Sequence, residues 1–299
     1  MKSIGAFVRL TRIEHALMLA IAVLLAIFIS AKAADATLPS IGIFAIALAV
    51  PALVQMASFA LNDYFDVETD RHNKKKERPI VSGEASAQEA LFIAAACYLL
   101  GNAASFFLGW GAFAITVVFS ILSIAYNARL KDVAIAGNAY IAASMGIPFV
   151  FGSVVAFGEI SRAAWVLAII AFIVGLGREI MKTAQDFEGD SKKRNAKTLP
   201  AYIGVQNSLK VAAGLFMLFA PLSYVPFLYG LGANLLSLGM VGVGDLAIIA
   251  VCARLLHLRE EKNKGENADS ETKDALKRCR DVSLMALFVG LVGYLAGAF

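Results

Sequence analysis

Residues 41–70 read IGIFAIALAVPALVQMASFALNDYFDVETD, an apolar run that ends abruptly in acidic side chains. An apolar run of about 20 residues is long enough to cross roughly 30 Å of hydrocarbon as a helix. The acidic end, residues 62–70, holds three aspartates, one glutamate and one asparagine. Ionised carboxylates at the end of a membrane helix are costly unless something compensates them. The stretch therefore indicates a membrane helix that presents oxygen ligands to a divalent cation.

The composition of the whole chain supports this interpretation. Its 299 residues are 59% hydrophobic and 17% charged, and the mean hydropathy is +0.70. Soluble domains are about 45–50% apolar and about 25% charged, so we predict a polytopic membrane protein. The three cysteines and three histidines are widely spaced, which argues against a disulfide framework or a zinc site. We expect nine spans, at residues 14–32, 41–61, 87–108, 111–128, 135–157, 163–181, 208–229, 237–257 and 280–299.

The basic residues are distributed unevenly across this topology. Every Lys and Arg except Lys32 and Arg162 falls on one side. The positive-inside rule makes that side the cytoplasm, with the N-terminus inside and the C-terminus outside the cell membrane. Topology accounts for the net charge of +4, which gives no indication of a nucleic acid partner. We expect function on the cytoplasmic face, where the long connections lie: residues 62–86, 182–207 and 258–279, the last of which looks like a solvated loop.

A second acidic stretch, REIMKTAQDFEGD at residues 178–190, ends the sixth predicted span. When Asp186 is placed over Asp66, Asp190 falls over Asp70, so both stretches contain the pattern D-x-x-x-D. Residues four apart share one face of a helix, and each pair can present two carboxylates to one point. One such stretch alone is equally consistent with a solvated helix end. Two matching stretches, four spans apart on the same side, favour two acidic clusters that face one another.

Basic residues accompany both stretches and the connection between them. Mg²⁺ is typically bound by one or two carboxylates together with substrate phosphates, and Lys or Arg can hold the remaining phosphate charge. The pattern therefore favours Mg²⁺ that bridges to a phosphorylated ligand. We expect Lys131 and Lys182 to contact that ligand, whereas residues 74–76 and 192–194 are better explained as determinants of topology.

The two acidic motifs resemble those of a known family. NDYFDVETD at residues 62–70 resembles the NDxxDxxxD motif of the UbiA superfamily of intramembrane prenyltransferases, and DFEGD at residues 186–190 is similar to its second aspartate motif. YNARLK at residues 126–131 resembles its tyrosine-and-lysine motif. The resemblance covers nearly the whole chain. It implies one all-helical membrane domain over residues 1–299, with nine transmembrane helices around a central cavity that cytoplasmic loops cap.

The resemblance also implies roles for single residues, because the family transfers an isoprenoid group from its diphosphate with the help of two Mg²⁺ ions. Asp70 would support the metal site, and Asp63 would be a ligand or lie behind the ligands. Tyr126 would line the cavity near the reacting carbon. The implied metal-binding set is Asn62, Asp66, Asp70, Asp186 and Asp190. The implied contacts to the diphosphate are Asn62, Asp63, Arg71, Arg78, Lys131 and Lys182, and catalysis would depend on Asp66, Asp70, Tyr126 and Lys131.

Shorter matches suggest the acceptor. RHN at residues 71–73, RPIVSG at 78–83, GREI at 177–180 and KTLP at 197–200 look most like the archaeal branch of the family that makes digeranylgeranylglyceryl phosphate. This implies transfer of a geranylgeranyl group to a lipophilic acceptor, geranylgeranylglyceryl phosphate, within membrane lipid. KTAQ at residues 182–185 departs from that branch, where a more acidic lead-in is expected.

Two other functions stay open at this point. The acceptor can instead be an aromatic ring, such as 4-hydroxybenzoate or a naphthoate in quinone or haem biosynthesis. A cation-coupled transporter would also use intramembrane carboxylates, but it would place them near the bilayer midplane rather than at helix ends. Arg9, Arg12 and Glu14, at the mouth of the first span, are either acceptor contacts or interface anchors.

Overall fold

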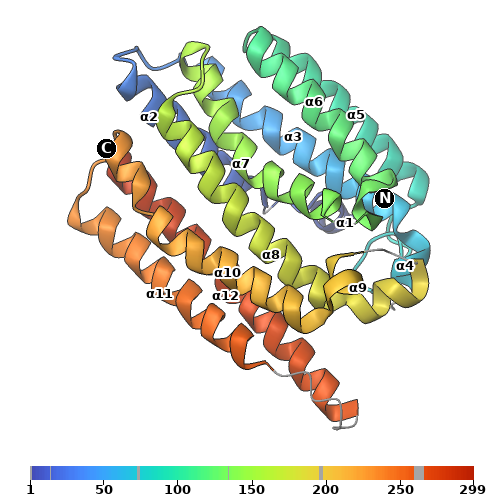
Figure 1. Ribbon diagram of the computed structural model, residues 1–299. Helices are drawn as coiled ribbons and strands as arrows, with labels where there is room; N and C mark the ends of the chain where they lie inside the picture. Colours follow the sequence, from blue (N-terminus) through green and yellow to red (C-terminus); the bar gives the residue numbers. More distant parts are fainter. Residues whose placement is uncertain (1, 14, 73–74, 134, 195–197, 259–265) are drawn as a thin grey trace. The chain divides into compact units, whose positions relative to one another are not determined.

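The computed structural model consists of helices (Figure 1) and describes residues 2–13, 15–72, 75–133, 135–194, 198–258 and 266–299. Within these ranges, side chains are described for all residues except 17, 188–194 and 266–271. Eight described helices are long and apolar enough to cross a membrane, and a shorter apolar helix covers Met18–Ala33. These nine segments lie where the sequence predicts spans, so the all-helical membrane fold is confirmed. The chain divides into two compact units, each described separately; the prediction of a single domain stays a prediction.

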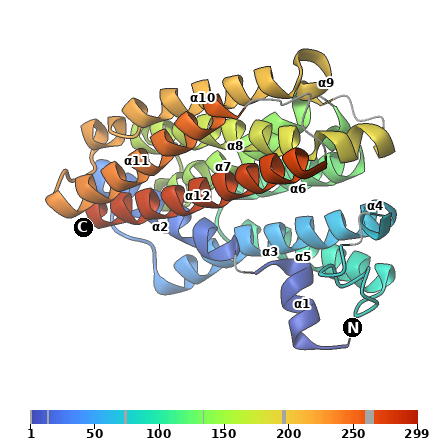
Figure 2. The same cartoon turned by 90° about the horizontal axis from the view of Figure 1, so that it is seen from below.

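The first unit comprises residues 1–130 and 148–161. Within it α3 packs against most of the other helices, namely α1, α2, α5 and α6. Figure 2 shows α1 set crosswise to α3, with its C-terminal end toward that helix. The bounds are α1 (Ile4–Thr11), α2 (His15–Ala33), α3 (Ile41–Phe65), α4 (Val67–His72), α5 (Ala87–Phe106) and α6 (Trp110–Ala128), followed by the end of α7 (Ala136–Phe157).

Local chemistry sets the ends of the α5–α6 hairpin. Ser86 and Glu89 form a reciprocal capping box at the start of α5, in which each side chain accepts from the backbone N–H of the other. A capping box satisfies two of the N–H groups that a helix start leaves unpaired. Gly109 separates the two helices with φ +98°, a conformation that side-chain-bearing residues rarely adopt. Gly109 thus permits the tight turn between α5 and α6.

A buried network of hydroxyl groups joins α2 to the far end of α7. Ser30 Oγ lies 2.9 Å from Ser153 Oγ and 2.8 Å from Ser161 Oγ. Ser153 Oγ donates to the carbonyl of Glu159 and accepts from the backbone N–H of Ser161. A Cβ added to Gly152 would lie 2.6 Å from the Val23 carbonyl oxygen, so the two helices meet backbone to backbone.

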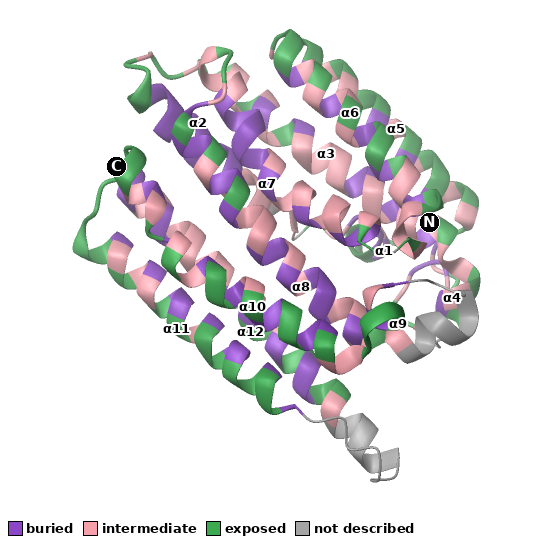
Figure 3. Ribbon diagram, viewed as in Figure 1, coloured by how far each residue is buried: buried purple, intermediate pink, exposed green. Residues whose placement is uncertain are grey.

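The second unit comprises residues 131–147 and 162–299. Here α11 and α12 form a closely packed pair, and α10 packs against both α8 and α11. α8 is the most buried of the candidate spans, with 56% of its most apolar window buried, and purple residues follow much of its length in Figure 3. The bounds are η1 (Leu130–Asp132), the start of α7, α8 (Arg162–Arg194), α9 (Leu199–Ile203), α10 (Val205–Leu222), η2 (Val225–Tyr229), α11 (Leu235–His257) and α12 (Glu266–Ala298).

Two features differ from the sequence prediction. α12 begins at Glu266, within residues 258–279, which we expected to be a solvated loop. Ala275, Leu276 and Cys279 are buried in the core of the second unit, and this short apolar stripe at helical spacing is hidden among charged residues. The short helices α1, α4 and α9 were also not predicted, because segments of five to eight residues are too short for periodicity to be read from sequence.

Candidate active site

The acidic stretch of the first unit spans a break between two helices. α3 runs through Asn62 and Asp63 to Phe65, Asp66 ends it with φ −93° and ψ 2°, and α4 begins at Val67. The Asp66 N–H donates to the Asn62 carbonyl, and the Asp70 N–H donates to the Asp66 carbonyl. The backbone therefore keeps a helical course past the break, and the polar side chains fall on two faces.

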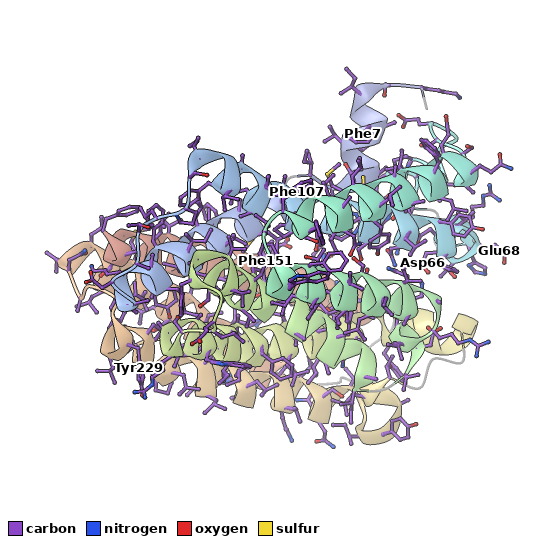
Figure 4. All side chains as sticks on the ribbon, turned by 90° about the horizontal axis from the view of Figure 1, so that it is seen from above. Phe7, Asp66, Glu68, Phe107, Phe151 and Tyr229 are labelled. Carbon is purple, nitrogen blue, oxygen red and sulfur yellow. The ribbon has the colours of Figure 1, made fainter. Side chains whose placement is uncertain are left out.

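One face is half-buried and holds the Asn62–Asp66 pair. Asn62 Nδ2 donates to Asp66 Oδ2 at 2.9 Å, as expected for residues four apart along a helix. Figure 4 shows Asp66 lying farther in than Glu68, which points outward at the edge of the unit. An amide and a carboxylate thus converge where a ligand can reach them.

The other face is buried and already neutralised by cations of the chain. Asp63 and Asp70 are 2% and 3% exposed. Asp63 Oδ1 accepts from Arg12 Nη2 at 2.8 Å and from Arg78 Nη1 at 2.6 Å. Asp70 pairs with Lys75 at 3.0 Å, and Arg78 Nε lies 3.7 Å from its other oxygen. These two carboxylates are compensated without an external ion.

The end of α6 carries Tyr126 and is tied to α3 by its neighbour. Asn127 is buried, and its Nδ2 donates to the Ser123 carbonyl at 3.0 Å and to the Ser58 carbonyl at 3.4 Å. Ser58 lies on α3, one turn before Asn62. Tyr126 is partly exposed. Asn127 thus fixes the helix that carries Tyr126 against the helix that carries the acidic stretch.

The remaining predicted residues are spread over both units. Arg71 is exposed on α4 of the first unit. In the second unit Lys131 lies partly exposed in η1, Asp186 is exposed near the end of α8, and Lys182 pairs with Glu179 at 3.1 Å. The side chain of Asp190 lies outside the described residues. Whether the two acidic stretches face one another stays a prediction.

Sequence reasoning missed several functional neighbours. Lys75 was interpreted as a determinant of topology, yet it pairs with Asp70. Arg12 was left between two roles, and it pairs with Asp63 from 51 residues away. Asn127 was quoted in a motif without a role, although a lone amide in the last turn of an apolar helix is a signal that it has a buried partner.

The described residues fit Mg²⁺ better than a metal ion whose ligands all come from the protein. Among the described side chains, no three His, Cys, Asp or Glu residues converge as a metal-binding group. Mg²⁺ usually takes one or two carboxylates and completes its shell with water and substrate phosphates. The Asn62–Asp66 pair supplies oxygen ligands of this kind at a half-buried position.

Comparison with known proteins identifies related sequences over nearly the whole chain. A model of the UbiA prenyltransferase family matches residues 19–268. Digeranylgeranylglyceryl phosphate synthase of Archaeoglobus fulgidus is 33% identical over 293 residues, which cover 97% of this chain and 94% of the relative. The protein of the same name from Korarchaeum cryptofilum is 32% identical over 300 residues, covering 100% and 99% of the two chains.

Solved structures share the fold. One from a study of digeranylgeranylglyceryl phosphate synthase in membranes has a TM-score of 0.71 and 26% identity, and covers 100% of this chain and 99% of its own. A UbiA homologue from Archaeoglobus fulgidus bound to GPP and Mg²⁺ has a TM-score of 0.63 and 20% identity, covering 94% and 99%. With the helices, motifs and relatives in agreement, the chain belongs to the UbiA prenyltransferase family.

Proposed function

We propose that the chain transfers a geranylgeranyl group from geranylgeranyl diphosphate to the free hydroxyl of geranylgeranylglyceryl phosphate, in a reaction that requires Mg²⁺. The observation that carries the proposal is the half-buried Asn62–Asp66 pair, two hard oxygen ligands beside compensated carboxylates. Relatives that carry the name of this activity at 32–33% identity over nearly their full length support the choice of acceptor. The homologue solved with GPP and Mg²⁺ supports the donor class.

The metal site in this proposal uses both acidic stretches. Asn62, Asp66, Asp186 and Asp190 would hold two Mg²⁺ ions on the diphosphate. Asp70 would support the site through its pair with Lys75. Bound Mg²⁺ supplies charge that stabilises the diphosphate as it leaves.

The cations of the chain would act on the same diphosphate. Arg71, Lys131 and Lys182 offer N–H donors at exposed or partly exposed positions, where they would bind its oxygens. Arg78 is paired with both buried carboxylates. It would add positive charge on the buried face of the acidic stretch. Tyr126, held by the Asn127 anchor, would line the cavity near the reacting carbon.

The transfer exchanges one carbon–oxygen bond for another. The bond between C1 of the prenyl group and the diphosphate breaks, and its electron pair leaves with the diphosphate. A bond forms between that carbon and the hydroxyl oxygen of the glycerol, and the hydroxyl proton is released. An apolar surround keeps water from capturing the allylic carbon first, which is a reason for running this chemistry inside a membrane.

We place the reaction at the cytoplasmic face of the cell membrane. The acidic stretches belong to connections rich in Lys and Arg, which the positive-inside rule assigns to the cytoplasm. Both isoprenoid tails would remain in the lipid, while the charged groups of donor and acceptor meet at the helix ends.

The direct test is an acceptor competition with purified protein in lipid nanodiscs. Geranylgeranyl diphosphate and Mg²⁺ are supplied with geranylgeranylglyceryl phosphate, 4-hydroxybenzoate or a dihydroxynaphthoate, and products are separated by mass. We expect an ether product with the glyceryl phosphate alone, no product after chelation by EDTA, and recovery when Mg²⁺ is restored. Prenylation of an aromatic acceptor without the ether product would contradict the proposed acceptor.

Variants of the acidic stretches test the site in the same assay. Asp66→Asn and Asp186→Asn should each lower the rate by at least about 100-fold, because a lost metal ligand removes roughly 3 kcal/mol of transition-state stabilisation. Glu68→Gln is the matched control, since Glu68 is exposed on α4 within the same stretch and should retain the wild-type rate within about twofold. Full activity of both asparagine variants would rule out this metal site.

A further inference from the structure

Three separate segments of the first unit meet at the carboxylate of Asp63. Arg12 ends α1, Asp63 belongs to the last turn of α3, and Arg78 opens the turn over residues 78–85. Both arginines donate to the same oxygen, Oδ1, at 2.8 and 2.6 Å. The Asp63 side chain is 1% exposed, and its Oδ2 is also buried and has no hydrogen-bond partner among the described residues. Neither oxygen is accessible to a metal ion in this arrangement.

Arg12 is held in place by more than this ion pair. Its backbone adopts the left-handed conformation, with φ 46° and ψ 49°, which residues with side chains rarely occupy. Its guanidinium group also stacks over Phe59 of α3, 4.4 Å from the ring centroid, a favourable cation–π contact. Strained backbone persists only where surrounding contacts fix it, so the Arg12–Asp63 contact is strongly specified.

Apolar packing connects the same three segments. Leu10 of α1 and Ile80 of the turn lie in one buried cluster with Ala57, Ala60 and Leu61 of α3. The Lys2 N–H donates to the Glu84 carbonyl, which joins the other end of α1 to the turn. Asp63 is thus the polar centre of an assembly that surrounds the end of α3.

We propose that Asp63 is a positioning residue: through Arg12 and Arg78 it fixes α1 and the turn over residues 78–85 against α3, and so holds the neighbouring Asn62–Asp66 pair in place. The inference rests on the proposed function in one respect, that Asn62 and Asp66 bind Mg²⁺. It assigns to α1 a part in organising the site, and it separates the role of Asp63 from that of the metal ligands.

The experiment combines hydrogen exchange of α1 with kinetics, for the variants Asp63→Asn and Arg12→Ala. Exchange of the amides of residues 4–11, measured by mass spectrometry without substrate, should become at least about tenfold faster in both variants, because local opening governs exchange. The value of kcat should fall about tenfold, while the Mg²⁺ concentration for half-maximal rate stays within about twofold. The double variant should be no slower than the slower single variant, because both changes remove one interaction.

Lys2→Ala is the matched control, since it removes an exposed cation just before the same helix and leaves the contact between the Lys2 N–H and the Glu84 carbonyl in place. Its α1 exchange and its kcat should stay within about twofold of wild type, as expected for a surface substitution. A rise in the Mg²⁺ requirement of Asp63→Asn with unchanged α1 exchange would make Asp63 a metal ligand and overturn the proposal. Faster exchange with unchanged kcat would also overturn it. Absence of transfer by the wild type would instead contradict the proposed function, and unchanged exchange would still refute the anchoring.

Discussion

The helical repeat places the polar side chains of the acidic stretch on two faces, one buried and one half-buried. Asn62 and Asp66 are four residues apart and share the half-buried face. Asp63 and Asp70 are seven residues apart, close to two full turns, and share the buried face. The chain neutralises the buried pair with its own arginines and lysine. The other face carries the amide and the carboxylate that we propose as ligands of an ion arriving with substrate.

Asn127 offers a test of anchoring at the level of one residue. Its side chain reaches the Ser58 carbonyl on α3 besides the carbonyl four residues earlier in α6. Asn127→Ala should therefore lower stability by about 1 kcal/mol, because it removes the hydrogen bond that joins α6 to α3. In detergent this should appear as a drop in Tm of several degrees.

Asn207 provides the comparison for Asn127. It is exposed, and among the described residues its side chain donates only to the carbonyl of Ile203, the last residue of α9. Asn207→Ala should shift the Tm by less than about 1 °C, since surface substitutions usually change stability by under 0.5 kcal/mol. Equal shifts for the two variants would show that the contact with α3 has no measurable effect on stability.

Some pairs of helices in this protein approach closely at glycines. In the second unit a Cβ added to Gly244 of α11 would lie 2.9 Å from the Ala286 carbonyl of α12. One added to Gly293 would lie 2.9 Å from Met240 Cβ. Close approach of this kind is the usual basis of helix association in lipid, where burial of apolar surface gives little driving force.

Two alanine substitutions in α11 separate packing from helix propensity. Gly244→Ala should destabilise the α11–α12 pair by about 1–3 kcal/mol, because the added methyl group meets backbone that cannot move aside. Gly239→Ala has open space around it and should be neutral or stabilising by up to about 1 kcal/mol. Thermal unfolding in detergent measures both. A lower Tm for the Gly239 variant than for the Gly244 variant would contradict this account of the interface.

At the scale of the whole molecule, the orientation in the membrane is open to a chemical test. The native cysteines are free and buried, so they should react slowly with a membrane-impermeant maleimide. Ala34→Cys, at an exposed position after α2, should be labelled in intact cells. Ser82→Cys, exposed in the turn over residues 78–85, should be labelled only after permeabilisation. The reverse pattern would invert the predicted topology.

Physical reasons determine which parts of the fold and of the site can be predicted from the sequence. Nine apolar helices were predictable because hydrocarbon requires long apolar segments with satisfied backbones, and the acidic stretch stood out against them. The partners of its carboxylates were not predictable. Arg12 reaches Asp63 from another helix, and Lys75, which pairs with Asp70, lies beyond the end of α4. The first contact depends on tertiary packing, and the second lies outside helical spacing, so neither leaves a periodic signal in the sequence.

The hydroxyl network at Ser153 bears on how the protein is made. Residues 148–161 complete the first unit, although residues 131–147 of the second unit precede them in the chain. The partner of Ser30 therefore leaves the ribosome only after part of the second unit has been synthesised. Until then the Ser30 hydroxyl of α2 lacks the partners that it has in the folded protein. We expect insertion to be followed by a delayed docking step, so a ribosome stalled before residue 153 should hold a protease-sensitive first unit.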